Sequence, residues 1–279
     1  ILALKYRETG YNTEFTGTFE CNDDFLNLYR QKALRTLYIT MRDTYMDCPD
    51  RERAQWWGDM VNEMGEAFYA LDTRANGLAK KGILELANWQ RPDHTIYSPI
   101  PAGNWHRELP MQMLNSVGYF GYWTYYLYSG DLETIRAVYP AVKRYLSIWK
   151  LGKDGLVVPR KGGWTWGDWG NNKDMTMLYN GWYYLALKGQ LNMAEALGET
   201  GDLADIKTKM ASIEANFNKT FWNGREYRSP DYKGETDDRA HALALVSGLA
   251  KVEQYSAIRE VFKTQEHSSP YMEKYVGEA

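Results

Sequence analysis

A short segment of the chain, residues 47–59, carries the side chains best suited to chemistry. It holds four carboxylates, two arginines and two tryptophans: Asp47, Asp50, Glu52, Asp59, Arg51, Arg53, Trp56 and Trp57. Carboxyl groups transfer protons, indole rings stack on the apolar faces of sugars, and guanidinium groups orient carboxylates. This combination in one segment predicts a pocket that cleaves a carbohydrate.

The crowding of these carboxylates has a chemical consequence. Carboxylates this close in sequence repel one another, so some must be buried, paired or raised in pKa. Glycosidases need one protonated and one ionised carboxyl group, and crowding can supply both. A structural role remains open for each residue. Asp47 could cap a turn at Pro49, Asp59 could be the N-cap of a following helix, and Glu52 could form a surface ion pair with a neighbouring arginine.

A second segment rich in glycine and tryptophan, residues 162–170, predicts further contacts with a sugar. Its glycines let the backbone approach a ligand, Trp166 and Trp169 can stack on a ring, and Asp168 can accept hydrogen bonds from a sugar diol. The alternative is a tight aromatic turn with a purely structural role. Trp105, on another long link between helices, is also a predicted substrate contact.

Composition excludes several classes of protein. The chain has 279 residues and a net charge of −3, which gives no electrostatic reason to expect nucleic acid as a partner. Its 11 tryptophans and 22 tyrosines suit carbohydrate binding or a large helical core. Two cysteines and four scattered histidines form no disulfide framework or zinc motif, so we expect no metal or cofactor. No apolar run is long enough for membrane insertion.

Hydrophobic periodicity predicts ten helices that alternate in character. Their expected ranges are 24–46, 59–72, 74–91, 109–128, 131–151, 175–198, 202–219, 237–250, 252–265 and from 269 onward. The second, fourth, sixth and eighth of these helices are apolar nearly all round for much of their length and must be buried on all sides, whereas the first, third, fifth, seventh and ninth have a charged face. Two concentric layers follow: an all-α, incomplete (α/α)6 six-hairpin barrel with about five hairpins. A solenoid of helical pairs would show a sequence repeat of fixed period, and this chain shows none.

The links between the predicted helices divide by length. Long links, at 47–58, 92–108, 152–174 and 220–236, all lead from an outer helix to an inner one. They therefore meet at one end of the barrel, where binding sites are usually built.

The chain also predicts a domain organisation. Residues 1–20 favour short strands or an extended lead-in, the end of a preceding β domain, and residues 21–279 form the barrel domain without its last hairpin. We expect a piece of a larger protein with further domains, in the periplasm or outside the cell rather than in the cytoplasm.

The 47–59 segment also resembles a known family. Its pattern, Asp47-Cys48-Pro49, then Arg51-Glu52-Arg53, Trp56 and Gly58-Asp59, is similar to that of bacterial α-L-rhamnosidases of glycoside hydrolase family 78. The segments 167–169 and 237–240 add supporting similarity, and the resemblance covers most of the chain. It implies a six-hairpin (α/α) barrel that hydrolyses terminal α-L-rhamnosides with inversion. Trp57 and the segment 105–112 depart from the expected pattern, which leaves the exact sugar open.

The resemblance also implies roles for individual residues. Glu52 is expected to be the general acid, and the general base is expected to be a glutamate beyond residue 279. The expected substrate-binding residues are Asp47, Arg51, Trp56, Asp59, Trp105, Trp166, Asp168 and Trp169. Alternatives are a six-hairpin glycosidase for another sugar, a polysaccharide lyase and a non-catalytic carbohydrate-binding barrel.

Overall fold

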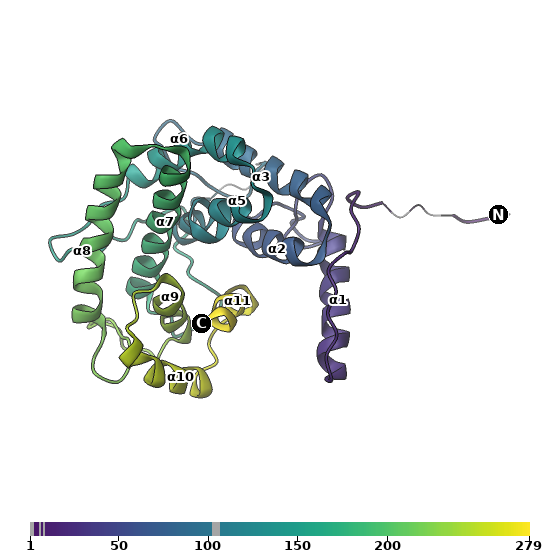
Figure 1. Cartoon of the computed structure of the whole chain (residues 1–279). Helices are drawn as coiled ribbons and strands as arrows, with labels where there is room; N and C mark the ends of the chain where they lie inside the picture. The colour runs from purple at the N-terminus through teal and green to yellow at the C-terminus, as the bar shows by residue number, and fades with distance from the viewer. Residues whose placement is uncertain (1–2, 6, 8, 102–106) are drawn as a thin grey trace.

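Two concentric rings of helices make up the molecule (Figure 1). The computed structural model describes residues 3–5, 7, 9–101 and 107–279. The outer ring contains α1 (Asp24–Thr40), α3 (Asn76–Asn88), α6 (Leu132–Ser147), α8 (Leu203–Phe221) and α10 (Tyr255–Thr264). The inner ring contains α2 (Trp57–Ala70), α4 (Pro110–Val117) with α5 (Thr124–Ser129), α7 (Met175–Leu197), α9 (Asp238–Ser247) and α11 (Pro270–Glu278).

The inner helices pack against one another in chain order. Helix α2 contacts α4, α4 contacts α7, α7 contacts α9, and α9 contacts α11. Helix α11 in turn contacts α2. In α7 every residue from Met177 to Leu187 is buried, whereas α6 buries one stripe that includes Ile135, Val138 and Val142. The predicted alternation of buried and half-exposed helices is therefore confirmed. Within the part of the chain that the structure describes, it gives five outer–inner pairs of an all-α barrel.

Helix boundaries agree with the predicted ones except at a few points. The helix expected over 109–128 is interrupted after Gly118 by a π-helical turn, η2 (Tyr119–Trp123). Gly118 lies so close to α7 that a Cβ atom there would come within 2.8 Å of the Cα of Ala186. The regular α-helical backbone is therefore interrupted where this helix crosses α7. The predicted helix starts at Asp131 and Ser269 are confirmed, since both side chains cap their helices.

The inner helix α2 begins two residues earlier than expected. Trp56 occupies its N-cap position, and Asp59 lies within the first turn. Asp59 is therefore not the N-cap, and the structural role considered for it is wrong. Its carboxylate is instead free to face a pocket at this end of the barrel.

Links from inner to outer helices are short and lie at the opposite end. Three of them contain a 3-10 turn: η1 (Thr73–Ala75), η3 (Thr200–Asp202) and η4 (Val252–Gln254). Residues 9–20 of the lead-in form no helix, and Phe15 forms an isolated bridge with Leu71 at the end of α2. No strands join into a sheet among the described residues, and the assignment of this segment to a preceding β domain stays a prediction.

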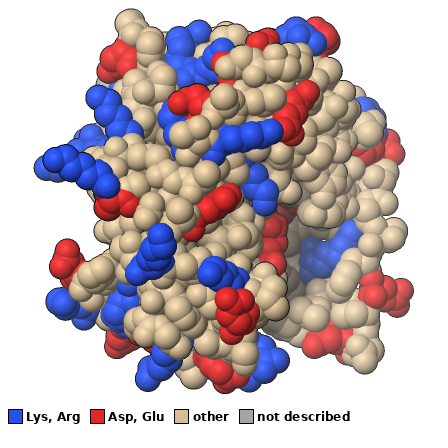
Figure 2. Space-filling view, turned by 60° about the vertical axis from the view of Figure 1, so that its left-hand side comes forward, with Lys and Arg blue, Asp and Glu red and all other residues tan. Residues whose placement is uncertain are grey.

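Charged side chains of both signs are interspersed over the face shown in Figure 2. This distribution accords with the small net charge of −3. Across the described ranges, no helix combines the length and apolarity needed to cross a lipid bilayer.

Candidate active site

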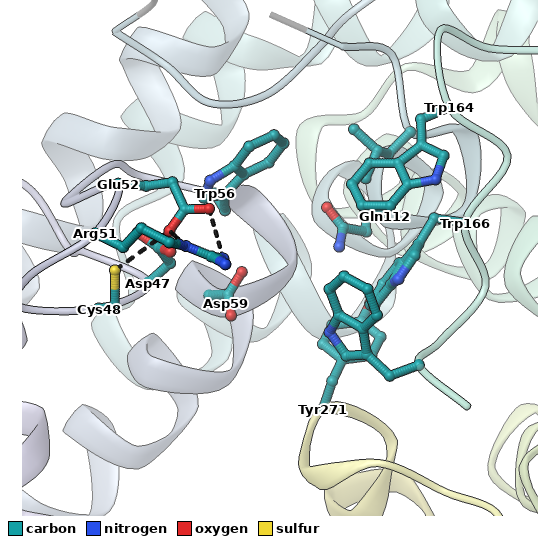
Figure 3. Close-up of a pocket in the computed structure, with 12 residues that line it drawn as sticks. Asp47, Cys48, Arg51, Glu52, Trp56, Asp59, Gln112, Trp164, Trp166 and Tyr271 are labelled. Atoms are coloured by element: carbon teal, nitrogen blue, oxygen red, sulfur yellow. Dashed lines mark hydrogen bonds and ion pairs between the residues drawn. The ribbon is translucent and has the colours of Figure 1, made fainter. Parts of the chain in front are cut away.

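A pocket of about 340 Å³ opens at the end of the barrel where the long links meet. It is formed by the loop before α2, the first turns of α2, α4 and α11, and the loop before α7. In Figure 3 acidic side chains form one wall and aromatic rings form the facing wall. We call it the acidic–aromatic pocket. Its volume lies at the small end of the range of about 300–1,000 Å³ typical of ligand pockets.

Hydrogen bonds across the loop fix the acidic wall in place. Asp47 and Ala54 pair twice, because the Asp47 N–H donates to the Ala54 carbonyl and the Ala54 N–H donates to Asp47 Oδ1, each at 3.0 Å. The Gln55 side chain donates to the Ile100 carbonyl at 2.8 Å, and the Trp57 N–H donates to Ser98 Oγ at 2.8 Å. Asp47 thus closes the loop on itself, and the neighbouring 98–100 segment holds the loop against the barrel.

Glu52 forms a bidentate ion pair with Arg51. Arg51 Nε donates to one carboxylate oxygen at 2.7 Å, and Arg51 Nη2 lies 2.6 Å from the other. The hydrogen bond from Arg51 is the main reason that the pKa of Glu52 lies below its usual value. The surface pairing considered from the sequence is therefore present, and Glu52 is ionised in this state of the protein.

The two aspartates of the acidic wall behave in the opposite way. Burial raises the pKa of Asp47, and the negative charge of Glu52 raises it further. Burial, followed by the charges of Asp47 and Glu52, raises the pKa of Asp59 to about 7. Near neutral pH the pocket therefore holds a partly protonated carboxyl group, Asp59, beside an ionised one, Glu52, and glycoside hydrolysis requires one group of each kind.

The aromatic wall is a cluster of rings in mutual edge contact. The ring centroids of Trp164 and Trp166 lie 5.9 and 5.7 Å from that of Trp169, and Trp166 lies 4.9 Å from Tyr271. Trp169 is 57% exposed and Trp164 is 40% exposed. Two indoles thus keep open surface for a ligand, while Trp166 supports them from beneath.

The structure brings most of the predicted site residues together. Seven of them line the pocket: Asp47, Arg51, Glu52, Trp56, Asp59, Trp166 and Trp169. Trp105 lies outside the described residues. Asp168 does not line the pocket, and its side chain is fully buried. The direct sugar contact expected for Asp168 therefore finds no support in the geometry.

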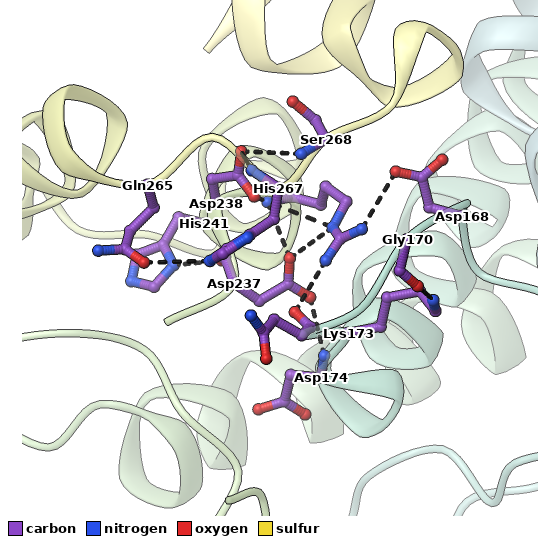
Figure 4. A network of polar contacts seen from close by, with 12 residues as sticks. Asp168, Gly170, Lys173, Asp174, Asp237, Asp238, His241, Gln265, His267 and Ser268 are labelled. Atoms are coloured by element: carbon purple, nitrogen blue, oxygen red, sulfur yellow. Dashed lines mark hydrogen bonds and ion pairs between the residues drawn. The ribbon is translucent and has the colours of Figure 1, made fainter. Parts of the chain in front are cut away.

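Asp168 belongs to a buried polar network that also includes Asp237 and Asp238 (Figure 4). The guanidinium group of Arg239 joins these carboxylates. Arg239 donates to Asp168 Oδ2 at 3.2 Å and to Asp237 Oδ1 at 2.6 Å. The Ser269 N–H, at the start of α11, donates to the same Asp168 oxygen at 2.9 Å. Arg239 also donates to the backbone carbonyl of Trp169. Asp168 thus joins the tryptophan loop to α9 and α11, behind the aromatic wall.

Five further residues line the pocket and were not among the predicted contacts: Cys48, Leu109, Gln112, Trp164 and Tyr271. Gln112 is the most informative, because its side chain is buried and its Oε1 has no hydrogen-bond partner among the described residues. A buried amide oxygen without a partner is costly, so we expect a ligand group to satisfy it. One sequence signal could have found Gln112 and Tyr271, since both stand in first turns of inner helices, as Asp59 does.

One group in this pocket could hold a metal ion. Donor atoms of Asp47, Cys48 and Glu52 lie within 4.8 Å of one another, which is true of no other such set of three in the described ranges. Cys48 Sγ also donates to Glu52 at 3.5 Å. Cys48 is therefore in contact with Glu52, whose charge is paired with Arg51.

Comparison with known proteins places the chain in a family. The model of the bacterial α-L-rhamnosidase six-hairpin glycosidase domain matches residues 14–272. A curated α-L-rhamnosidase from Formosa agariphila is 24% identical over 267 residues, covering 86% of this chain and 27% of that protein.

Solved structures agree with the fold. A family 78 rhamnosidase from Bacillus sp. GL1 superposes with a TM-score of 0.84 and 21% identity, covering 96% of this chain and 29% of that one. A Streptomyces avermitilis α-L-rhamnosidase complexed with L-rhamnose superposes with a TM-score of 0.73 and is 21% identical. The match covers 89% of this chain and 23% of that one. The chain thus spans less than a third of the length of these relatives. It belongs to the bacterial α-L-rhamnosidase six-hairpin glycosidase domain family.

Proposed function

We propose that the protein containing this chain hydrolyses terminal α-L-rhamnosides with inversion, and that Glu52 is the general acid. The observation that carries the proposal is the acidic–aromatic pocket itself, where Asp47, Glu52 and Asp59 face exposed indole rings. Family membership supports rhamnose as the sugar, and the Streptomyces relative was solved with L-rhamnose bound.

Each wall of the pocket has its own part in the reaction. Asp47 and Asp59 accept or donate hydrogen bonds to the sugar hydroxyls, and Trp56 packs against the ring with the facing indoles. Glu52 lies at the edge of the pocket, where the glycosidic oxygen must be protonated. When a sugar replaces water around Glu52, its carboxylate loses solvation and its pKa rises, which favours uptake of the proton.

Inversion requires a base on the opposite face of the sugar, with the two carboxyl groups separated by roughly 6.5–9.5 Å. The facing wall is aromatic, and none of its described lining residues is acidic. This supports a general base supplied by a segment beyond residue 279.

Asp59 is a second candidate for the general acid. Its pKa of about 7 lets it carry a proton at neutral pH, whereas Glu52 is ionised by Arg51. We favour Glu52 because it also lines a second, adjacent pocket of about 850 Å³, whereas Asp59 lines the acidic–aromatic pocket and not that one. The two candidates respond differently to the loss of Arg51, as described in the Discussion.

The test follows the sugar released from an aryl α-L-rhamnoside by the full-length protein, using NMR. We expect β-rhamnose to appear first and then to mutarotate. Release of α-rhamnose first would contradict inversion. If other aryl glycosides are hydrolysed and the rhamnoside is not, the assignment of rhamnose is wrong.

A further inference from the structure

A second, larger pocket lies directly against the acidic–aromatic pocket. Its volume is about 850 Å³, and it shares Arg51, Glu52 and Trp56 with its neighbour. Its remaining wall includes Asp43, Arg53 and Pro99. We call it the arginine–proline pocket. The shared side chains form a partition with one pocket on each side.

The position of Glu52 in this partition assigns a role to the second pocket. A general acid donates its proton to the oxygen that joins the sugar to its leaving group, so it must reach both partners at once. The acidic–aromatic pocket holds the sugar in the proposed function. We propose that the arginine–proline pocket is the leaving-group subsite, and that it binds a further sugar residue rather than an aromatic aglycone. The inference rests on the proposed function and extends it to the other side of the scissile bond.

The lining of the second pocket favours a sugar. Asp43 and Arg53 are exposed, and neither side chain has a hydrogen bond or ion pair with another described residue. They offer a carboxylate acceptor and a fork of guanidinium donors to ligand hydroxyl groups. Trp56 contributes the aromatic ring among the described lining residues, whereas the tryptophan cluster lies in the other pocket. An aryl group would therefore have one indole ring to stack on, whereas the exposed charged side chains match the several hydroxyl groups of a sugar.

The backbone conformation at Arg53 is unusual, and its side chain belongs to the second pocket only. Arg53 has a φ of 49°, which is in the left-handed region that residues other than glycine seldom adopt. Arg51 lines both pockets, and Arg53 lines the second pocket alone. Such a conformation costs energy and persists where the surrounding structure imposes it, often at ligand sites. The chain changes direction at this position, and the Arg53 side chain lines the second pocket and not the first.

The test compares two classes of substrate on the full-length protein. Wild type, Arg53→Ala and Asp43→Ala are assayed with nitrophenyl α-L-rhamnoside and with a panel of rhamnosyl disaccharides of different linkages. Loss of a hydrogen bond to a charged side chain should lower kcat/KM on the best disaccharide about 10-fold. The aryl substrate should change less than about 2-fold. Arg225→Ala is the matched control, because Arg225 is 88% exposed and lines neither pocket.

Two outcomes would overturn the subsite assignment while leaving the proposed function intact. One is an equal fall on both substrate classes. The other is wild-type hydrolysis of the aryl rhamnoside with no hydrolysis of any rhamnosyl disaccharide. If wild type releases rhamnose from neither class, the proposed function itself fails and the subsite fails with it.

Discussion

Two arginine–carboxylate pairs at the same end of the barrel differ sharply in their surroundings. Arg51 and Glu52 form a short bidentate pair whose side chains are 82% and 30% exposed. Arg239 and Asp168 form a pair whose side chains are both fully buried. The residue types are similar, but solvent surrounds the first pair, while the second is enclosed by α9, α11 and the tryptophan loop.

This difference in burial distinguishes an ion pair that can open for a substrate from one that only supports the structure. An exposed ion pair contributes little to stability because water competes for both charges, so the Arg51–Glu52 pair can open when a substrate arrives. A buried pair cannot open without leaving a charge in the interior. Arg239 also binds the backbone carbonyls of Asn171 and Asn172, each at 2.8 Å. The buried pair therefore holds the loop that carries the indoles, and the exposed pair is the one to which the proposed function gives a part in the reaction.

The largest effect on stability should come from breaking the buried pair. Arg239→Met leaves Asp168 and Asp237 buried without their cation, so we expect the free energy of unfolding to fall by about 3–5 kcal/mol. Urea denaturation followed by tryptophan fluorescence measures this change. A loss below about 1 kcal/mol, the value for an exposed pair, would show that the two pairs do not differ as described.

A smaller effect on stability should follow Arg51→Ala, because water competes with Glu52 for the exposed Arg51 guanidinium group. Its pH dependence is more informative. Arg51 stabilises the ionised form of Glu52 and lowers its pKa, so removal of Arg51 raises that pKa. If Glu52 is the acid, the alkaline limb of the kcat/KM profile should move to higher pH. An unmoved limb would transfer the role to Asp59, whose raised pKa is caused mainly by burial.

The fold was largely predictable because it depends on local patterns. The all-round apolar sequence of α7 predicts a buried helix without knowledge of its neighbours. The break after Gly118 was not predictable, since it depends on the approach of Ala186 from a distant helix. Periodicity describes one helix at a time and carries no information on where two helices cross.

The site was predictable where its residues are close in sequence. Asp47, Glu52 and Asp59 stand within one segment, so their crowding is evident from the sequence alone. Gln112 and Tyr271 reach the pocket from other helices, and no acidic cluster surrounds them in sequence to mark them. Asp168 has the same chemistry as Asp59 and stands beside tryptophans. Only its burial against Arg239 shows that it supports the pocket from behind.

The assignment of Glu52 as the proton donor is the central claim, and one measurement tests it directly. Glu52→Gln in the full-length protein is assayed on a dinitrophenyl α-L-rhamnoside, whose leaving group needs no proton, and on a rhamnosyl disaccharide, whose leaving group does. We expect a loss of about 10²–10⁴ in rate on the disaccharide and a much smaller loss on the aryl substrate. An equal loss on both would contradict the assignment and leave Glu52 with a binding role.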